Sequence, residues 1–163
     1  MTNFRKANLK DLTIISQLAH EIWWNTYKGV ISDDQIELML SKIYDLKSLE
    51  EQLNTGHTFI ILNFEGKDVG FAAYSIYDID KNYKLEKLYL SKTIQGKGLG
   101  NLLIKKVEEE VKNLGASYLY LNVNRNNKAF NFYQKVGYEV VEEVDIPYFG
   151  FVLNDYIMRK ALN

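Results

Sequence analysis

The segment from Lys84 to Leu114 reads KLEKLYLSKTIQGKGLGNLLIKKVEEEVKNL, and it decides the fold. Its first part, Leu85–Leu90, alternates apolar and polar residues as a half-buried β-strand does. A glycine-rich turn follows at 95–100. After it, apolar residues recur at helical spacing, at Leu99, Leu102, Leu103, Val107, Val111 and Leu114. The segment therefore predicts a strand, a glycine-rich turn and an amphipathic helix.

The turn in front of this helix predicts an anion site. The first amides of a helix have no intrahelical partner, and the helix dipole adds partial positive charge there. Glycines at 96, 98 and 100 place no Cβ between these amides and a phosphate. The spacing does not match the Rossmann fingerprint, which fails at Asn101, or the P-loop motif. It matches Q-x-x-G-x-G, carried by Gln95, Gly98 and Gly100.

A second motif follows the next predicted strand. Residues 126–138 read NNKAFNFYQKVGY and fill every fixed position of N-x-x-A-x-x-[FL]-Y-x-K-x-G-[FY]. With both motifs present, the chain resembles the GNAT superfamily of acyl-CoA-dependent N-acetyltransferases. The strand Leu85–Tyr89 also resembles the IERIY-type central strand of bacterial polyamine N-acetyltransferases.

The order of the predicted elements extends this resemblance over residues 1–163. It implies a single α/β (α+β) domain with the GNAT fold. That fold has a mixed, mostly antiparallel seven-stranded sheet, a central splayed parallel strand pair and about four flanking helices. The predicted strands are Asn3–Ala7, Thr58–Phe64, Asp68–Tyr77, Leu85–Leu90, Tyr118–Val123, Tyr138–Val144 and Phe151–Arg159, the last two joined around Pro147. Helices are predicted from Leu12 to Trp24, from Ser32 to Ile43, over Lys47–Leu53, over Leu99–Leu114 and over Asn126–Val136.

Composition excludes several classes of function. The net charge of -1, with both signs interspersed, provides no basic footprint for nucleic acid and no polybasic membrane patch. The absence of cysteine excludes disulfides, thiolate metal sites and cysteine nucleophiles. No apolar run approaches the ~18 to 20 residues that cross a membrane. We expect a cytoplasmic protein; homodimers are common in the family, but the sequence carries no sign of one.

The resemblance implies acetyl-CoA as the acyl donor, without a metal. The main chain of the central strand would bond the pantetheine arm and the thioester carbonyl. Asn126 is also a candidate helix N-cap, and the two lysines of the motifs pair with phosphates or are simply solvated. The expected cofactor-binding residues are Leu88, Tyr89, Leu90, Gln95, Gly96, Lys97, Gly98, Leu99, Gly100, Asn101, Asn126, Ala129, Tyr133 and Lys135.

Two residues are candidates for catalysis. The Tyr133 phenol, protonated at neutral pH, would donate a proton to the departing thiolate, or it is only a packed ring. Glu86 would act as the base or bind the amine, or it is a structural carboxylate. It shares a face with Leu88 and Leu90 only if the strand carries no bulge, and the family often has one there.

The resemblance places the acceptor between the first two helices and the last hairpin. The aromatic candidates there are Trp23, Trp24, Tyr27, Tyr148 and Phe149. His20 and His57 are expected to be structural. We predict an N-acetyltransferase that moves an acetyl group to a primary amine, on a small molecule such as a polyamine or on a peptide. The alternative is a catalytically silent acyl-CoA-binding module that acts through a protein partner; Tyr133 favours the enzyme.

Overall fold

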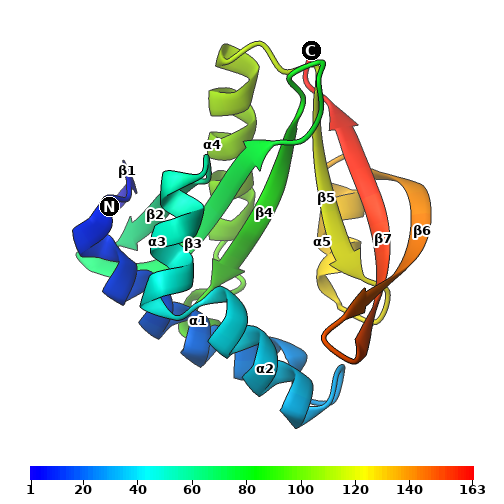
Figure 1. Cartoon of the computed structure of the whole chain (residues 1–163). Coiled ribbons are helices and arrows are strands. Elements are labelled where there is room, and N and C mark those ends of the chain that lie inside the picture. Colours follow the sequence, from blue (N-terminus) through cyan, green and yellow to red (C-terminus); the bar gives the residue numbers. More distant parts are fainter.

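Seven β-strands form one sheet in the order β1-β2-β3-β4-β5-β7-β6 (Figure 1). The computed structural model describes all 163 residues. Every neighbouring pair is antiparallel except β4 and β5, which run parallel in the middle of the sheet. This confirms the predicted mixed sheet with a central parallel pair. The strands are β1 Thr2–Lys6, β2 Thr58–Phe64, β3 Lys67–Ile76, β4 Tyr83–Leu90, β5 Tyr118–Asn124, β6 Glu139–Tyr148 and β7 Phe151–Ala161.

Five α-helices cover the two faces of the sheet. α1, α2 and α3 lie on one face, which we call the α1 face, and α4 and α5 lie on the other, the α4 face (Figure 1). The helices are α1 Leu12–Tyr27, α2 Asp33–Ile43, α3 Leu46–Asn54, α4 Leu99–Asn113 and α5 Ala129–Lys135, with short 3-10 helices at Leu9–Asp11 and Lys92–Ile94.

Strand alternation explains why the sheet has a core on each face. In β2, Phe59 and Ile61 pack against α1–α3, whereas Ile60 and Leu62 pack on the side of α4. Successive side chains of a strand point to opposite faces, so one apolar run supplies both cores. β2 and β3, buried on both faces, form the rigid support on which β4 lies.

Side-chain caps explain where the early helices begin. The Ser32 hydroxyl accepts a hydrogen bond from the Gln35 amide at 3.1 Å, and the Asp45 carboxylate accepts one from the Ser48 amide at 2.7 Å. Each cap satisfies one amide that the helix leaves without a partner. The start predicted at Ser32 is confirmed.

Two predictions about the C-terminal part are wrong. The helix predicted over Asn126–Val136 is shorter and begins at Ala129. The Asn124 side chain accepts a hydrogen bond from the Asn126 amide, and the Asn127 side chain accepts one from the Ala129 amide, so this stretch forms a turn. The turn of the last hairpin lies at Phe149 and Gly150, not at Pro147. Pro147 belongs to β6, an edge strand, where a missing N–H is tolerated.

Candidate active site

A cleft opens where the two parallel strands separate. β4 and β5 pair only through Tyr83–Leu85 and Leu119–Leu121, and beyond this point they diverge. Past Leu85, the edge of β4 that faces β5 has no strand partner. The resulting cavity has a volume of about 1140 Å³ and is lined by residues from both faces of the sheet. Unpaired main-chain groups in such an opening are available to a ligand.

The glycine turn forms one end of this cleft. Gly98 is the N-cap of α4 with φ +75°, and no side chain caps the helix. A Cβ at Gly96 or Gly98 would meet no atom within 4 Å, so the space in front of these amides is open. Gln95 reaches back with its side-chain amide to the Leu90 carbonyl at 3.3 Å, which ties the turn to β4. This geometry suits an anionic group at the helix N-terminus.

Tyr133 of α5 lies on the α4 side of the cleft. Its side chain is 8% exposed and packs edge-on against Phe132 and Tyr138. Burial raises the pKa of the Tyr133 phenol, so it keeps its proton across the neutral range. A protonated phenol at the cleft wall can donate that proton to a leaving group.

A bulge in β4 decides where Glu86 points. Ala73 pairs with Lys87 and Tyr74 pairs with Leu85, so Glu86 is an extra residue in the ladder. Glu86 therefore does not share a face of the sheet with Leu88 and Leu90, as it would in a regular strand. The Glu86 carboxylate accepts a hydrogen bond from Ser75 at 3.0 Å and lies 3.9 Å from the Lys84 amine. It still lines the cleft, but from the α1 face.

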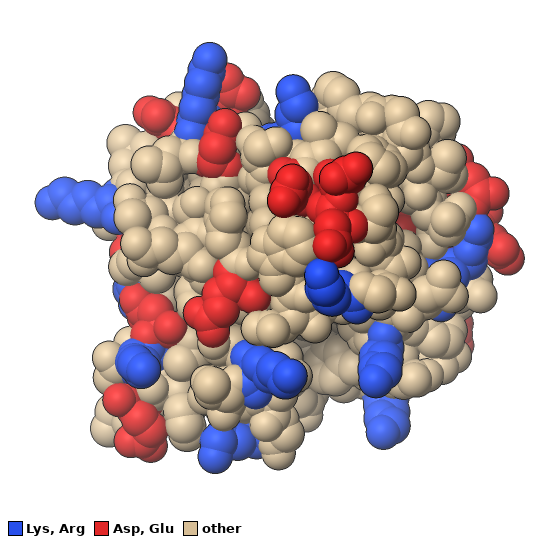
Figure 2. Space-filling view, turned by 90° about the horizontal axis from the view of Figure 1, so that it is seen from below, with Lys and Arg blue, Asp and Glu red and all other residues tan.

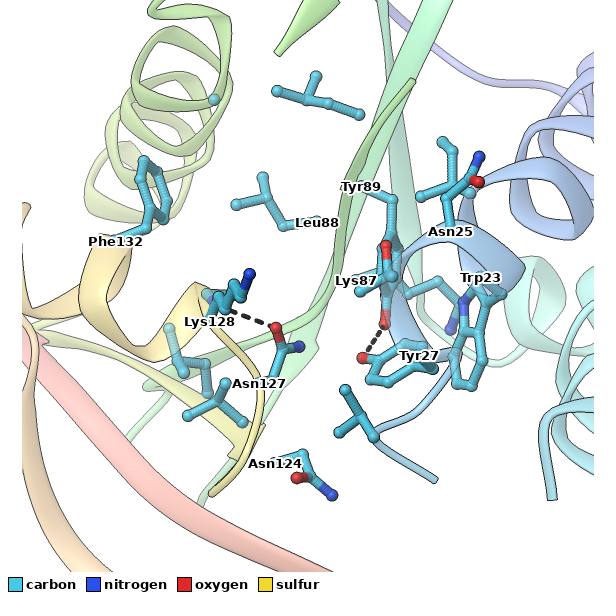
Figure 3. A pocket seen from close by; sticks show the side chains of 18 of the residues that line it. Trp23, Asn25, Tyr27, Lys87, Leu88, Tyr89, Asn124, Asn127, Lys128 and Phe132 are labelled. Atoms are coloured by element: carbon cyan, nitrogen blue, oxygen red, sulfur yellow. Dashed lines mark hydrogen bonds between the residues drawn. The ribbon is translucent and has the colours of Figure 1, made fainter. Parts of the chain in front are cut away.

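The α1 face contributes aromatic side chains. The hydroxyls of Tyr27 and Tyr89 are 3.0 Å apart, and their rings, with that of Trp23, lie together beside β4 (Figure 3). Burial raises the pKa of both phenols. Tyr148 lines the same cleft from the last hairpin.

Most of the predicted site residues come together. Those that line the cleft are Trp23, Tyr27, Glu86, Leu88, Tyr89, Leu90, Gln95, Gly96, Gly98, Leu99, Gly100, Asn101, Asn126, Ala129, Tyr133 and Tyr148. Trp24, Lys97, Lys135 and Phe149 do not line it. Lys97 and Lys135 are exposed, whereas Lys92 and Lys128 line the cleft.

Sequence reasoning missed several polar residues of the cleft. Asp155 of β7 is half-buried, and burial raises the pKa of its carboxyl group. Lys87, Gln52 and His57 also line the cleft, on the α1 face. Asp155 lies opposite Asn124 of β5. Only knowledge of this strand pairing would have pointed to Asp155, because its neighbours in sequence carry no motif.

Three further observations concern metal ions, membrane crossing and surface charge. Nowhere in the protein do three or more His, Asp or Glu side chains gather in a way that could hold a metal ion. None of the helices combines the length and the apolar content that a membrane crossing requires. The face seen from below mixes Lys and Arg with Asp and Glu (Figure 2).

A parallel strand pair that separates in the middle of the sheet, followed by an uncapped glycine turn at a helix N-terminus, is the arrangement of an acyl-CoA-dependent acetyltransferase. The chain belongs to the acetyltransferase (GNAT) domain family, whose model matches residues 27–151. It is 30% identical over 162 residues to the spermidine N(1)-acetyltransferase of Thermoplasma acidophilum, covering 96% of this chain and 94% of that protein. It is 33% identical over 116 residues to the spermine/spermidine N(1)-acetyltransferase of Bacillus subtilis, covering 65% of this chain and 76% of that protein.

Solved structures agree with the assignment. The crystal structure of PaiA N-acetyltransferase from Thermoplasma acidophilum in complex with coenzyme A superposes with a TM-score of 0.84. The two sequences are 28% identical, and the alignment covers 99% of each chain. The predictions of a GNAT fold and of an acetyl-CoA-dependent N-acetyltransferase are confirmed. None of these relatives is named as a silent binding module.

Proposed function

We propose that the chain acetylates a primary amine of a polyamine, with acetyl-CoA held across the β4–β5 opening. The observation that carries the proposal is the opening itself. It brings the glycine turn, the free edge of β4 and Tyr133 into one cavity with the carboxylates of Glu86 and Asp155. Relatives named for spermidine and spermine support the acceptor class.

The residues at the glycine turn fit the pyrophosphate of the cofactor. The space beside Gly96 and Gly98 is open, and no side chain caps α4. Lys92 and Lys128 line the same end and supply positive charge. The free edge of Leu88–Leu90 would bond the pantetheine arm, and Ala129 and Asn126 would flank it from the turn before α5.

The chemistry needs three contributions from the protein. Acetyl-CoA supplies a thioester, which is the electrophile. A backbone N–H of Leu88–Leu90 would stabilise the oxyanion, a contribution of ~3 to 4 kcal/mol per donor. Tyr133, kept protonated by burial, would donate a proton to the departing sulfur. Glu86 would accept the proton of the incoming ammonium, directly or through water, from the α1 face.

Asp155 is the proposed anchor for a second ammonium of the acceptor. It is half-buried on β7 and receives only a long hydrogen bond of 3.4 Å from Asn122. A carboxylate that is partly desolvated and weakly paired gains from a cationic ligand. The aromatic faces of Trp23 and Tyr27 on the opposite wall favour a cation as well.

The test is a thiol-release assay with acetyl-CoA and a panel of spermidine, spermine, 1,4-diaminobutane and a peptide with a free N-terminus. We expect release with at least one polyamine. Asp155→Asn should raise the KM for that polyamine by about 10- to 100-fold, the usual loss for a charged hydrogen bond, while the acetyl-CoA KM stays unchanged. Asp80→Asn, in an exposed loop, is the control. Release only with the peptide would refute the polyamine assignment.

A further inference from the structure

Three buried side-chain atoms of the protein have no hydrogen-bond partner, and all three belong to residues that line the same cleft. They are Trp23 Nε1, Gln52 Oε1 and His57 Nδ1. Buried polar atoms are almost always paired in folded proteins. These three atoms on one cavity are groups that a bound ligand can pair.

Lys87 adds an unpaired charge to the same place. Its side chain is 7% exposed, and no carboxylate or hydrogen-bond acceptor holds its amine. Instead the amine lies 5.6 Å from the ring centres of both Tyr44 and Phe59. Glu86 is next to it in sequence but is bound to Ser75 and lies beside Lys84. A buried lysine without a partner is unfavourable unless a ligand supplies one.

These groups line one part of the cleft, which we call the inner pocket and define by Trp23, Tyr44, Gln52, His57 and Lys87. Tyr44 packs on Trp23 with ring centres 5.6 Å apart, and His57 stacks on Phe59 at 6.3 Å. Lys87 lies over both Tyr44 and Phe59, so it joins the two contacts. Figure 3 shows Lys87 and Trp23 on one side of β4, with Leu88 and Phe132 on the other.

The inner pocket is complementary to an anion. Trp23 Nε1 can only donate a hydrogen bond, and the Lys87 ammonium donates up to three. A carboxylate accepts from both and neutralises the lysine. A second ammonium would be repelled by Lys87 instead. The Gln52 carbonyl and the His57 nitrogen remain for water or for a donor on the ligand.

We propose that the inner pocket binds a carboxylate at the far end of the acceptor, so that the enzyme also acetylates ω-amino carboxylates. This inference rests on the proposed acetyl transfer at the same cleft. The amine nitrogen forms a bond to the acetyl carbon, the carbon–sulfur bond breaks, and coenzyme A leaves as the thiol. The ammonium of the acceptor loses two protons: one passes through Glu86 to solvent, and the other replaces the proton that Tyr133 donates to the thiol. Polyamines would extend toward Asp155, and ω-amino carboxylates toward Lys87.

The experiment compares acceptors of equal length that differ only at one end: 1,4-diaminobutane with 4-aminobutanoate, and 1,6-diaminohexane with 6-aminohexanoate. Thiol release and the mass of the acetylated product are measured with spermidine alongside. We expect the wild-type protein to acetylate at least one of the two carboxylates. Lys87→Met should raise its KM about tenfold or more through the lost ion pair, and should lower the KM for the matched diamine.

The controls separate the two proposals. Lys105→Met, on the exposed side of α4, should change neither KM. Release with spermidine but with neither carboxylate overturns the inner-pocket inference and leaves the proposed function standing. Equal effects of Lys87→Met on both members of a pair also overturn the inference. No release with any amine overturns both.

Discussion

At the scale of single residues, burial sets the protonation states in the cleft. It raises the pKa of the Tyr133 phenol and lowers the pKa of Lys87 to about 8, because both charged forms are poorly solvated there. Burial therefore keeps the phenol of Tyr133 protonated, and it makes the ammonium of Lys87 lose its proton more easily. The two effects lead to separate predictions.

Replacing Tyr133 with Phe should lower kcat about 100-fold, which is the lower end of the range for the loss of a general acid. The dissociation constant for acetyl-CoA should stay unchanged. Steady-state kinetics and calorimetric titration measure the two quantities. Tyr138→Phe is the matched control, because that phenol is also buried but donates to Glu108 and does not line the cleft. Full turnover by Tyr133→Phe would show that another group protonates the sulfur.

Replacing Lys87 with Met should stabilise the fold by ~1 to 3 kcal/mol near neutral pH, since the charged amine loses solvation on burial and the rings of Tyr44 and Phe59 compensate only in part. Below the folded-state pKa of about 8, the amine is protonated in both states and the penalty is complete. Between about 8 and 10.5 only the unfolded chain keeps the proton, so wild-type stability rises with pH.

The measurement is urea unfolding of both proteins at about pH 7 and about pH 9.5. The gain from Lys87→Met should shrink at the higher pH, whereas Lys105→Met should show no such trend. The charged groups that act on Lys87 are Glu86, which favours the ammonium, and Lys84, which opposes it. A gain that is independent of pH would mean that packing, not charge, is responsible.

At the scale of elements, the junction of β4 and α4 carries the cofactor assignment. The glycine turn leaves the first amides of α4 uncapped, and the divergence of β4 from β5 leaves a free strand edge next to it. In the proposed function neither element would make a cofactor site alone, since phosphate binding and thioester binding need donors at both.

Gly98→Glu should weaken acetyl-CoA binding at least about tenfold, because its side chain enters the open space before α4 and its charge repels phosphate. Gly66→Glu is a close control. Gly66 also has a positive φ, +81° against +75°, and open space around a Cβ, but it lies in the β2–β3 turn. Both variants should lose similar stability in thermal melts, and only Gly98→Glu should lose affinity. Equal affinities would refute the pyrophosphate site.

At the scale of the whole molecule, the sheet consists of two parts joined by little main-chain pairing. β1–β4 form one part and β5, β7 and β6 the other, and only three residue pairs connect β4 with β5. A ligand bound across this junction contacts both parts. Its binding energy should therefore appear directly as stability of the whole fold.

Acetyl-CoA at about 100 times its dissociation constant should add ~2.7 kcal/mol to the free energy of unfolding. For a chain of this length that corresponds to roughly 5 to 10 °C in melting temperature. Hydrogen exchange should slow at the amides of 88–90 more than in β2, which is buried on both faces without a ligand. A melting temperature that does not move at saturation would contradict binding across the junction, and Gly98→Glu should show a smaller shift at the same acetyl-CoA concentration.

Much of the fold could be predicted because its signals are local. The glycine turn, the Ser32 cap and the alternation in β2 each depend on residues within one turn or one strand. For the same reason, the two motifs predicted that Tyr133 and the glycine turn belong to one site, and both line the cleft. Asn126 shows the limit of prediction from helical spacing. The helical pattern included this residue in α5, but asparagine side chains accept hydrogen bonds from the amides there and form a turn instead.

The sequence by itself determined the order of the strands and helices, the glycine turn at α4 and the tyrosine beside it. Only the tertiary structure decided which face Glu86 occupies and which residues meet Lys87. One extra residue in β4 moves a side chain to the other face of the sheet, and nothing within the strand marks that residue. Asp155, His57 and Gln52 reach the cleft through pairings and packing between distant segments. Contacts of that kind depend on the whole sheet, so they cannot be obtained from local spacing.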